Sequence, residues 1–90
     1  MTQHITILVS GKVQGVFYRA ASKEKADELG VKGFVRNELN GNVYMEAEGS
    51  KDVLNEFVKW CASGPPRAQV QHVEVVPGER KEFVNFSIVK

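Results

Sequence analysis

The stretch GFVRNELNGNVYMEAEG, residues 33–49, constrains the fold of this chain more than any other segment. Two runs typical of β-strands flank the dipeptide Asn40-Gly41, which is favoured in tight hairpin turns because both residues tolerate a positive φ. After the turn, apolar and polar residues alternate, with Val43, Met45 and Ala47 on one side and Tyr44, Glu46 and Glu48 on the other. This period of two predicts an antiparallel hairpin whose second strand has one apolar and one polar face.

Three further strands are expected around this hairpin. Residues 4–10, HITILVS, are rich in β-branched residues and predict a strand that is buried on both faces or nearly so. Residues 11–16 are expected to form a loop after it. Residues 70–76 and 83–89 predict the last two strands, and Pro77-Gly78 is expected to begin a charged loop between them.

Two amphipathic helices are also expected. The first runs from about Phe17 to Leu29, and Gly30 suits the position just after its end. The second has Ser50 as a good N-cap and stops at the Gly-Pro-Pro of residues 64–66. The residues expected on their apolar faces are Tyr18, Ser22, Ala26 and Leu29 in the first helix, and Val53, Leu54, Phe57, Trp60 and Cys61 in the second.

The order of these elements, β-α-β-β-α-β with an additional C-terminal strand, predicts an α+β fold. It is a two-layer α/β sandwich of ferredoxin-like type, with two helices on one face of a mixed, mainly antiparallel sheet and residues 1–90 in a single domain. Right-handed crossovers make the first and second strands parallel, with the third between them. The first loop and the hairpin then lie at the same end of the sheet, so Arg19 and Asn37 should lie near each other.

Composition excludes several classes of function. The chain has 90 residues, and its formal net charge of +1 gives no electrostatic footprint for duplex nucleic acid or an anionic membrane. A single cysteine, Cys61, allows no intrachain disulfide and no cysteine cluster for zinc. The N-terminus lacks the basic start of a signal peptide, and no segment approaches the roughly 20 apolar residues of a membrane span. We therefore expect a soluble cytoplasmic protein, by default a monomer, that binds neither nucleic acid nor membranes.

The segment from Gly11 to Arg19 is a candidate anion site. A glycine-bearing loop that leads into a helix presents several backbone N–H groups toward one point. A cation at the start of a helix is disfavoured by the helix dipole, so Arg19 is either solvated or holds an anion. The loop lacks the Gly-Lys-Ser/Thr of a nucleotide-binding P-loop, so ATP and GTP are not indicated. From loop composition alone, an ordinary connection with a solvated arginine is the alternative.

Two motifs carry a family resemblance. GKVQGVFYR, residues 11–19, followed by GFVRNELNGNVYMEAEG, resembles the paired signature of the acylphosphatases. That family has Gly-x-Val-Gln-Gly-Val-x-Phe-Arg in its first loop and Gly-x-Val-x-Asn before a hairpin. The segments SGPPRAQVQHVEV and FSI also resemble the family, so the resemblance covers essentially the whole chain.

The resemblance implies a site residue by residue. Arg19 would bind phosphate, together with the backbone amides of Gln14, Gly15, Val16, Phe17 and Tyr18, and Asn37 would position the attacking water. No metal and no organic cofactor are implied. Tyr18 stands where the family usually has phenylalanine, and we expect its added hydroxyl at a polar edge.

The implied reaction is the hydrolysis of an acyl phosphate to a carboxylate and inorganic phosphate. A carboxylate leaving group needs no general acid, so positioning and electrostatics carry the catalysis. Asparagine cannot act as a base near neutral pH, so the role of Asn37 is orientation. Phosphate monoesters leave as alkoxides and should react poorly at such a site.

The remaining histidine, cysteine and basic side chains are interpreted mainly as structural or surface residues. His4 and His72 have no Cys, Asp or Glu partner at metal-ligand spacing, and Cys61 is expected to be an inert core thiol. Lys12 and Arg36 could add positive potential around the site, but a solvated position on the surface is the favoured interpretation. The loop of residues 64–68, which includes Arg67, is a candidate wall of the site.

Two rival functions share the predicted fold. An RNA-binding module would need aromatic residues on the third strand, which here has only Tyr44 beside two glutamates. A non-catalytic anion- or ligand-binding module, such as a small-molecule sensing domain, would explain the sheet and helices but not the pairing of Arg19 with Asn37.

Overall fold

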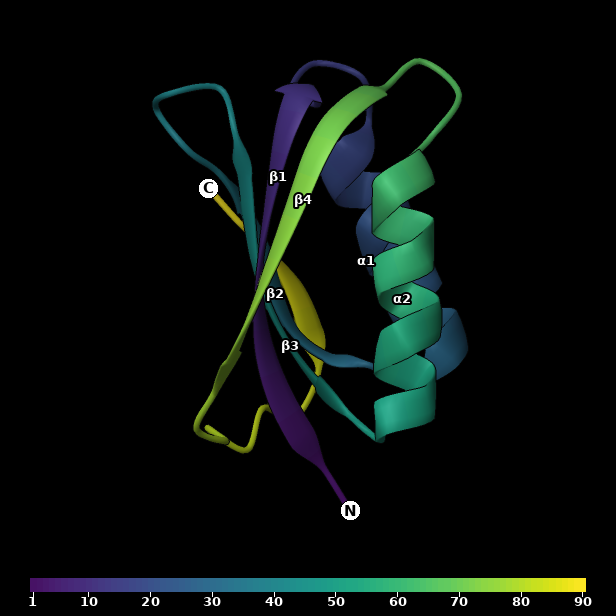
Figure 1. Cartoon of the computed structure of the whole chain (residues 1–90), viewed down its shortest axis with the longest axis vertical. Coiled ribbons are helices and arrows are strands. Elements are labelled where there is room, and N and C mark those ends of the chain that lie inside the picture. Colours follow the sequence, from purple (N-terminus) through teal and green to yellow (C-terminus); the bar gives the residue numbers. More distant parts are fainter.

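The computed structural model describes residues 1–90 and has two layers, a five-stranded sheet with both helices on one face (Figure 1). Along the chain the elements are β1 (Gln3–Lys12), α1 (Tyr18–Leu29), β2 (Lys32–Asn37), β3 (Val43–Gly49), α2 (Lys51–Ser63), β4 (Gln69–Gly78) and β5 (Phe86–Val89). The strand order across the sheet is β4-β1-β3-β2-β5. This arrangement confirms the predicted ferredoxin-like sandwich with an additional strand. Neither helix has the length and apolar character that crossing a membrane would require.

The pairing of the strands brings the two candidate segments together. β3 lies between β1 and β2 and is antiparallel to both, and its first residue, Val43, pairs with Val9 on one side and Asn37 on the other. The end of β1, which leads into the candidate loop, and the end of β2 therefore lie at the same edge of the sheet, at the top of Figure 1.

The core fills the space between the sheet and the helices. The helix-facing side of the sheet contributes Ile7, Val9, Val35, Val43 and Met45, all of them fully buried. The buried residues of the helices are Tyr18, Ser22 and Ala26 in α1 and Leu54, Phe57 and Cys61 in α2. The expected apolar faces are thus confirmed, with Leu29, Val53 and Trp60 partly buried at their margins.

Cys61 lies deep in this core. Its side chain is fully buried, and burial raises the pKa of the thiol to about 12. The thiol therefore stays protonated at neutral pH and lacks the thiolate character that reactive cysteines need. This agrees with the expectation of an inert core residue.

Local signals at the ends of the second helix and in the hairpin are also confirmed. The Ser50 side chain accepts a hydrogen bond from the Val53 N–H at 3.4 Å, as an N-cap does. Between β2 and β3, Gly41 has a φ of 95°, and the Glu38 N–H donates to the Asn42 carbonyl at 2.8 Å. The connection spans residues 38–42, so it is longer than the tightest turns that an Asn-Gly pair can form.

Two strand boundaries differ from the expectation. Gly11 and Lys12 belong to β1 rather than to a loop, because they pair with β4 after a register shift at Ser10. A Cβ on Gly11 would lie 2.2 Å from the Gln69 carbonyl oxygen, so this glycine permits the close approach of β4. Likewise Pro77-Gly78 does not begin a loop, because both residues extend β4 along β1.

The polar face expected on β3 is largely buried. Glu46 is 5% and Glu48 is 2% exposed, and both lie beside His4 on the face of the sheet without helices. His4 Nδ1 is 2.8 Å from Glu48 Oε2, and His4 Nε2 is 3.2 Å from Glu46 Oε1. The backbone N–H groups of Lys81 and Phe83 donate to Glu48, which draws the connection between β4 and β5 over this face. These hydrogen bonds take Phe83 out of the strand predicted for residues 83–89, so β5 begins only at Phe86.

Glu48→Gln is expected to destabilise the fold in a pH-dependent way. Burial alone would raise the pKa of Glu48, but hydrogen bonds from the Lys81 backbone and from His4 outweigh burial and hold the pKa below its ordinary value. The stabilisation from such a depressed pKa is complete above the ordinary glutamate pKa, about 4.3, and is lost as the pH falls through the folded pKa. At pH 7 we expect Glu48→Gln to lower the free energy of unfolding by about 1–3 kcal/mol.

The measurement is urea denaturation of the wild type and of Glu48→Gln at neutral and at acidic pH. The difference between them should begin to shrink below the ordinary glutamate pKa of about 4.3 and should disappear once Glu48 of the folded wild type is itself protonated. Glu74→Gln, at an exposed position of β4, is the control and should change stability little at either pH. A difference that is independent of pH would contradict the assignment.

Candidate active site

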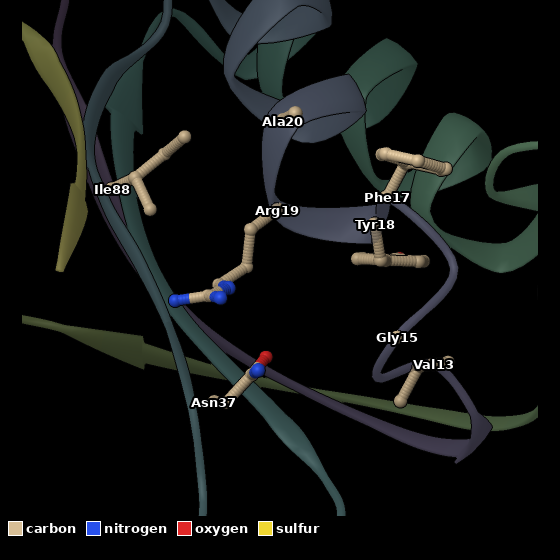
Figure 2. Close-up of a pocket in the computed structure, with 8 residues that line it drawn as sticks. All are labelled: Val13, Gly15, Phe17, Tyr18, Arg19, Ala20, Asn37 and Ile88. Carbon is tan, nitrogen blue, oxygen red and sulfur yellow. The ribbon is translucent and has the colours of Figure 1, made fainter. Parts of the chain in front are cut away.

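A cavity of about 330 Å³ opens where the end of β1, the start of α1, the end of β2 and β5 meet. Figure 2 shows the residues that line it, which are Val13, Gly15, Phe17, Tyr18, Arg19, Ala20, Asn37 and Ile88. Arg19 and Asn37, which are far apart in the sequence, line this one cavity. The expectation that they lie near each other is therefore confirmed.

The loop of residues 13–17 has an unusual backbone. Gly15 has a φ of 74° and Phe17 a φ of 65°, so two of its residues are left-handed. A Cβ on Gly15 would meet nothing within 4 Å, so the dihedral angle and not the available space favours glycine there. Left-handed residues within a turn direct neighbouring N–H groups to one side, and such a concave set of N–H groups binds anions.

The start of α1 adds to this anion-binding character. Phe17 occupies the N-cap position and its side chain makes no capping hydrogen bond, because it has no acceptor. No acidic residue stands in the first turn either. The N–H groups at this end of the helix, together with the helix dipole, thus favour an anion in the cavity.

Arg19 reaches across the cavity from α1 toward β5. The Nη1 atom donates to the Val89 carbonyl oxygen at 3.5 Å, a long contact, and no carboxylate pairs with the guanidinium. The half-buried side chain keeps most of its five N–H donors free. Such a guanidinium can bind two oxygens of one phosphoryl group side by side.

Asn37 is the last residue of β2, and its side chain lies on the same face of the sheet as Val35, the face covered by the helices. Its Oδ1 atom is buried and has no hydrogen-bond partner. Buried polar atoms in native proteins nearly always have a partner, and a water or a ligand group in the cavity can donate a hydrogen bond to this oxygen.

Gln14 contributes through its side chain, which the sequence did not predict. Its Nε2 atom donates to the carbonyl oxygens of Glu38 at 2.8 Å and Asn42 at 2.9 Å. These bonds fasten the candidate loop to the connection that directly follows Asn37. The side chain of Gln14 thus fixes the position of the loop relative to Asn37, and its place in the motif of residues 11–19 is the only sequence signal for it.

Tyr18 faces away from the polar part of the cavity. Its ring is 1% exposed, and its hydroxyl donates to the Cys61 carbonyl oxygen at 2.7 Å. Burial raises the pKa of this phenol, so it stays protonated. The expectation of a hydroxyl at a polar edge is wrong, because the ring packs between α1 and α2 and the hydroxyl ties the two helices together.

Several other charged residues lie outside the cavity. Arg36 is on the opposite face of the sheet, where its guanidinium carbon is 4.3 Å from the centre of the Tyr44 ring and Nε is 3.3 Å from Glu38 Oε2. Lys12 and His72 are exposed on strands, as expected. No residue of the 64–68 loop lines the cavity, so the expectation that this loop forms a wall of the site is wrong. His4 has no acidic partner at metal-ligand spacing in the sequence, and the structure has no group of side chains that could hold a metal ion; strand pairing instead brings Glu46 and Glu48 of β3 beside His4.

Comparison with known proteins identifies the family. A family model described as Acylphosphatase matches residues 5–88. The acylphosphatase of Alkalilimnicola ehrlichii is 48% identical over 75 residues, which cover 83% of this chain and 84% of that protein. Among solved structures, an acylphosphatase from Coxiella burnetii matches with a TM-score of 0.95 and 35% identity, covering 98% of this chain and 93% of that one. The acylphosphatase from Bacillus subtilis matches with a TM-score of 0.94 and 34% identity over the full length of both chains. By sequence and by structure, therefore, this chain belongs to the acylphosphatase family of hydrolases.

Proposed function

We propose that the acylphosphatase activity of this chain is carried out by Arg19, Asn37 and the backbone N–H groups of residues 14–18. In this mechanism, a water oriented by Asn37 attacks a phosphoryl group that Arg19 and the N–H groups hold. The observation that supports it most is that an arginine without an acidic partner and an unpaired buried amide oxygen line one cavity at the start of a helix.

The phosphoryl group would bind to the concave backbone of the loop. Its oxygens carry negative charge, which the N–H groups of the loop and of the first turn of α1 would stabilise together with the guanidinium of Arg19. As the bond to the leaving group lengthens, charge redistributes over these oxygens, and fixed donors lower the barrier because they need no reorganisation.

The nucleophile would be a water hydrogen-bonded to Asn37. Its oxygen forms a bond to phosphorus on the side opposite the acyl oxygen, and the bond from phosphorus to that oxygen breaks. The carboxylate leaves with the bonding electrons, and the proton of the water passes to phosphate oxygen or solvent. Asn37 acts by orientation, which can supply a large part of a rate enhancement when the reactants are held in line.

The leaving group accounts for the modest set of residues that this mechanism needs. A carboxylate is stable without protonation, so no general acid is required.

The proposal is tested with the purified chain, acetyl phosphate and excess EDTA, beside p-nitrophenyl phosphate as a monoester. We expect rapid hydrolysis of the anhydride that EDTA leaves unchanged, and little hydrolysis of the monoester. Loss of activity with EDTA would contradict a mechanism that needs no metal. A folded protein that hydrolyses neither compound would be an anion-binding module instead.

A further inference from the structure

The connection between β4 and β5, residues 79–85, has few contacts with the rest of the fold. We call it the strap, and in Figure 1 it lies at the bottom of the sheet, at the end opposite the candidate active site. Its only hydrogen bond between backbone groups runs from the Gly33 N–H to the Asn85 carbonyl oxygen at 2.8 Å. All of its residues except Phe83 are exposed. A segment with so little burial and backbone bonding can open without unfolding the rest of the molecule.

Two buried glutamates of β3, which we call the acidic pair, hold the strap on the face of the sheet without helices. Glu48 accepts hydrogen bonds from the backbone N–H groups of Lys81 and, at 3.0 Å, of Phe83. Glu46 Oε1 lies 2.8 Å from Lys81 Nζ, as an ion pair rather than an aligned hydrogen bond. The ring of Phe83 stacks on that of His4, with the ring centres 6.0 Å apart. The attachment of the strap therefore depends mainly on the acidic pair.

The backbone of the strap is shaped to bind a negative charge. Glu82, between the two residues whose N–H groups bind Glu48, has a φ of 57°, which is in the left-handed region. A left-handed residue turns the N–H groups on either side of it toward one point, and such a concave arrangement binds an anion. This conformation costs free energy for a residue other than glycine, so it persists only while the bonds to the carboxylate offset the cost.

The acidic pair is ionised at neutral pH. The ionisable groups that lie around Glu48 come from β1, β2, β3 and the strap, and they are His4, Lys32, Glu46, Arg80, Lys81 and Glu82. The edge strand β4 adds none, because Gly78 lies opposite His4. Burial alone would raise the pKa of Glu48, but hydrogen bonds from the Lys81 backbone and His4 outweigh it and lower the pKa. For Glu46, Lys81 and the Tyr44 hydroxyl likewise outweigh burial and lower the pKa.

We propose that the acidic pair is a pH-sensitive latch, from which the strap detaches on acidification while the rest of the fold stays intact. Protonation of Glu48 removes its charge, and hydrogen bonds to a neutral acceptor are about half as strong. The pKa of Glu48 is lower with the strap bound than with the strap open. The attachment is therefore complete above the ordinary glutamate pKa of about 4.3 and is lost as the pH falls through the lower value. Opening uncovers the Phe34 ring, which Phe83 contacts edge to face at 5.8 Å between ring centres.

Amide hydrogen exchange of the folded protein, followed residue by residue by NMR, tests this proposal. The protection factors of the Lys81 and Phe83 amides are compared with those of β3, the strand at the centre of the sheet. Between about pH 7 and about pH 3.5, we expect protection of the two strap amides to fall about tenfold more than that of β3, because two charge-assisted hydrogen bonds become neutral ones. Strap amides that exchange only with the global unfolding seen at β3 would overturn the proposal. Separate opening that does not respond to acid would overturn the role of Glu48.

A variant assigns the response to one carboxylate. Glu48→Gln has a similar size but no charge, so we expect about tenfold lower protection of both strap amides at neutral pH and no further response of these amides to acid. Glu74→Gln, at an exposed position of β4, is the matched control and should leave both amides unchanged. A Glu48→Gln protein whose strap amides still respond to acid like those of the wild type would contradict the assignment. The wild type alone tests the opening, so the proposal does not depend on the folding of the variant. No outcome depends on hydrolysis of an acyl phosphate, so the proposed function is tested separately.

Discussion

Arg19→Gln is expected to lower kcat/KM for an acyl phosphate at least about 10²-fold, the loss typical of removing one donor to a transition state. Glutamine has a similar reach but no charge and no fork of parallel N–H donors, so it cannot hold two phosphoryl oxygens as the guanidinium can. Because Arg19 would hold phosphate in the ground state as well, inhibition by inorganic phosphate should weaken together with the rate. Steady-state kinetics with phosphate as an inhibitor measures both effects.

The fold should tolerate this change. Within the protein, the Arg19 side chain makes only the long hydrogen bond to the Val89 carbonyl oxygen, and no ion pair is lost. We therefore expect the free energy of unfolding to change by less than about 0.5 kcal/mol, as for most surface substitutions. Arg67→Gln, at an exposed arginine outside the cavity, is the matched control and should keep the wild-type rate. A folded Arg19→Gln enzyme with a near-normal rate would remove Arg19 from the mechanism.

Asn37→Ala is expected to lower kcat about 10²-fold or more while inhibition by inorganic phosphate changes little. The amide would orient the water and not the phosphoryl group, so its loss falls on the chemical step and leaves binding largely intact. The kinetic effects of the two variants therefore differ, since Arg19→Gln weakens phosphate binding and lowers the rate together. Single-turnover and steady-state measurements with acetyl phosphate distinguish the two patterns.

The stability of Asn37→Ala gives a second, independent readout. Asn37 Oδ1 has no partner within the protein, so alanine removes a buried polar atom without breaking a hydrogen bond to it. We expect unchanged or slightly higher stability by urea denaturation, which is the pattern of a residue kept for function at some expense of stability. Asn55→Ala, at an exposed position of α2, is the control. Strong destabilisation by Asn37→Ala with little loss of rate would indicate a structural asparagine instead.

Short stretches of sequence were enough to predict the elements of the fold. Ser50 caps α2, the glycine after Leu29 ends α1, and Asn40-Gly41 lies in the hairpin, because each of these features depends on hydrogen bonds within a few residues. The errors were at boundaries that depend on a neighbouring strand. Pro77-Gly78 has the composition of a turn, yet pairing with β1 keeps both residues in β4.

Contacts between distant segments could not be read from the same patterns. The side chain of Gln14 binds carbonyl groups 24 and 28 residues away, and His4 meets Glu48 from 44 residues away. Which residues meet in this way depends on the register of β3 between its neighbours. A shift of one residue would turn Glu46 and Glu48 to the opposite face of the sheet, away from His4.

By itself, the sequence determined the order of the elements, their faces and the proximity of Arg19 to Asn37, because periodicity, caps and the handedness of crossovers are local or general rules. Only the tertiary structure decided which side chains line the cavity and which lie outside it. It turned the hydroxyl of Tyr18 into the core, left Phe17 exposed at the cavity, and removed Arg36 and the 64–68 loop from the site. The physical reason is that a side chain's surroundings depend on strand register and on packing between layers, which only the complete fold establishes.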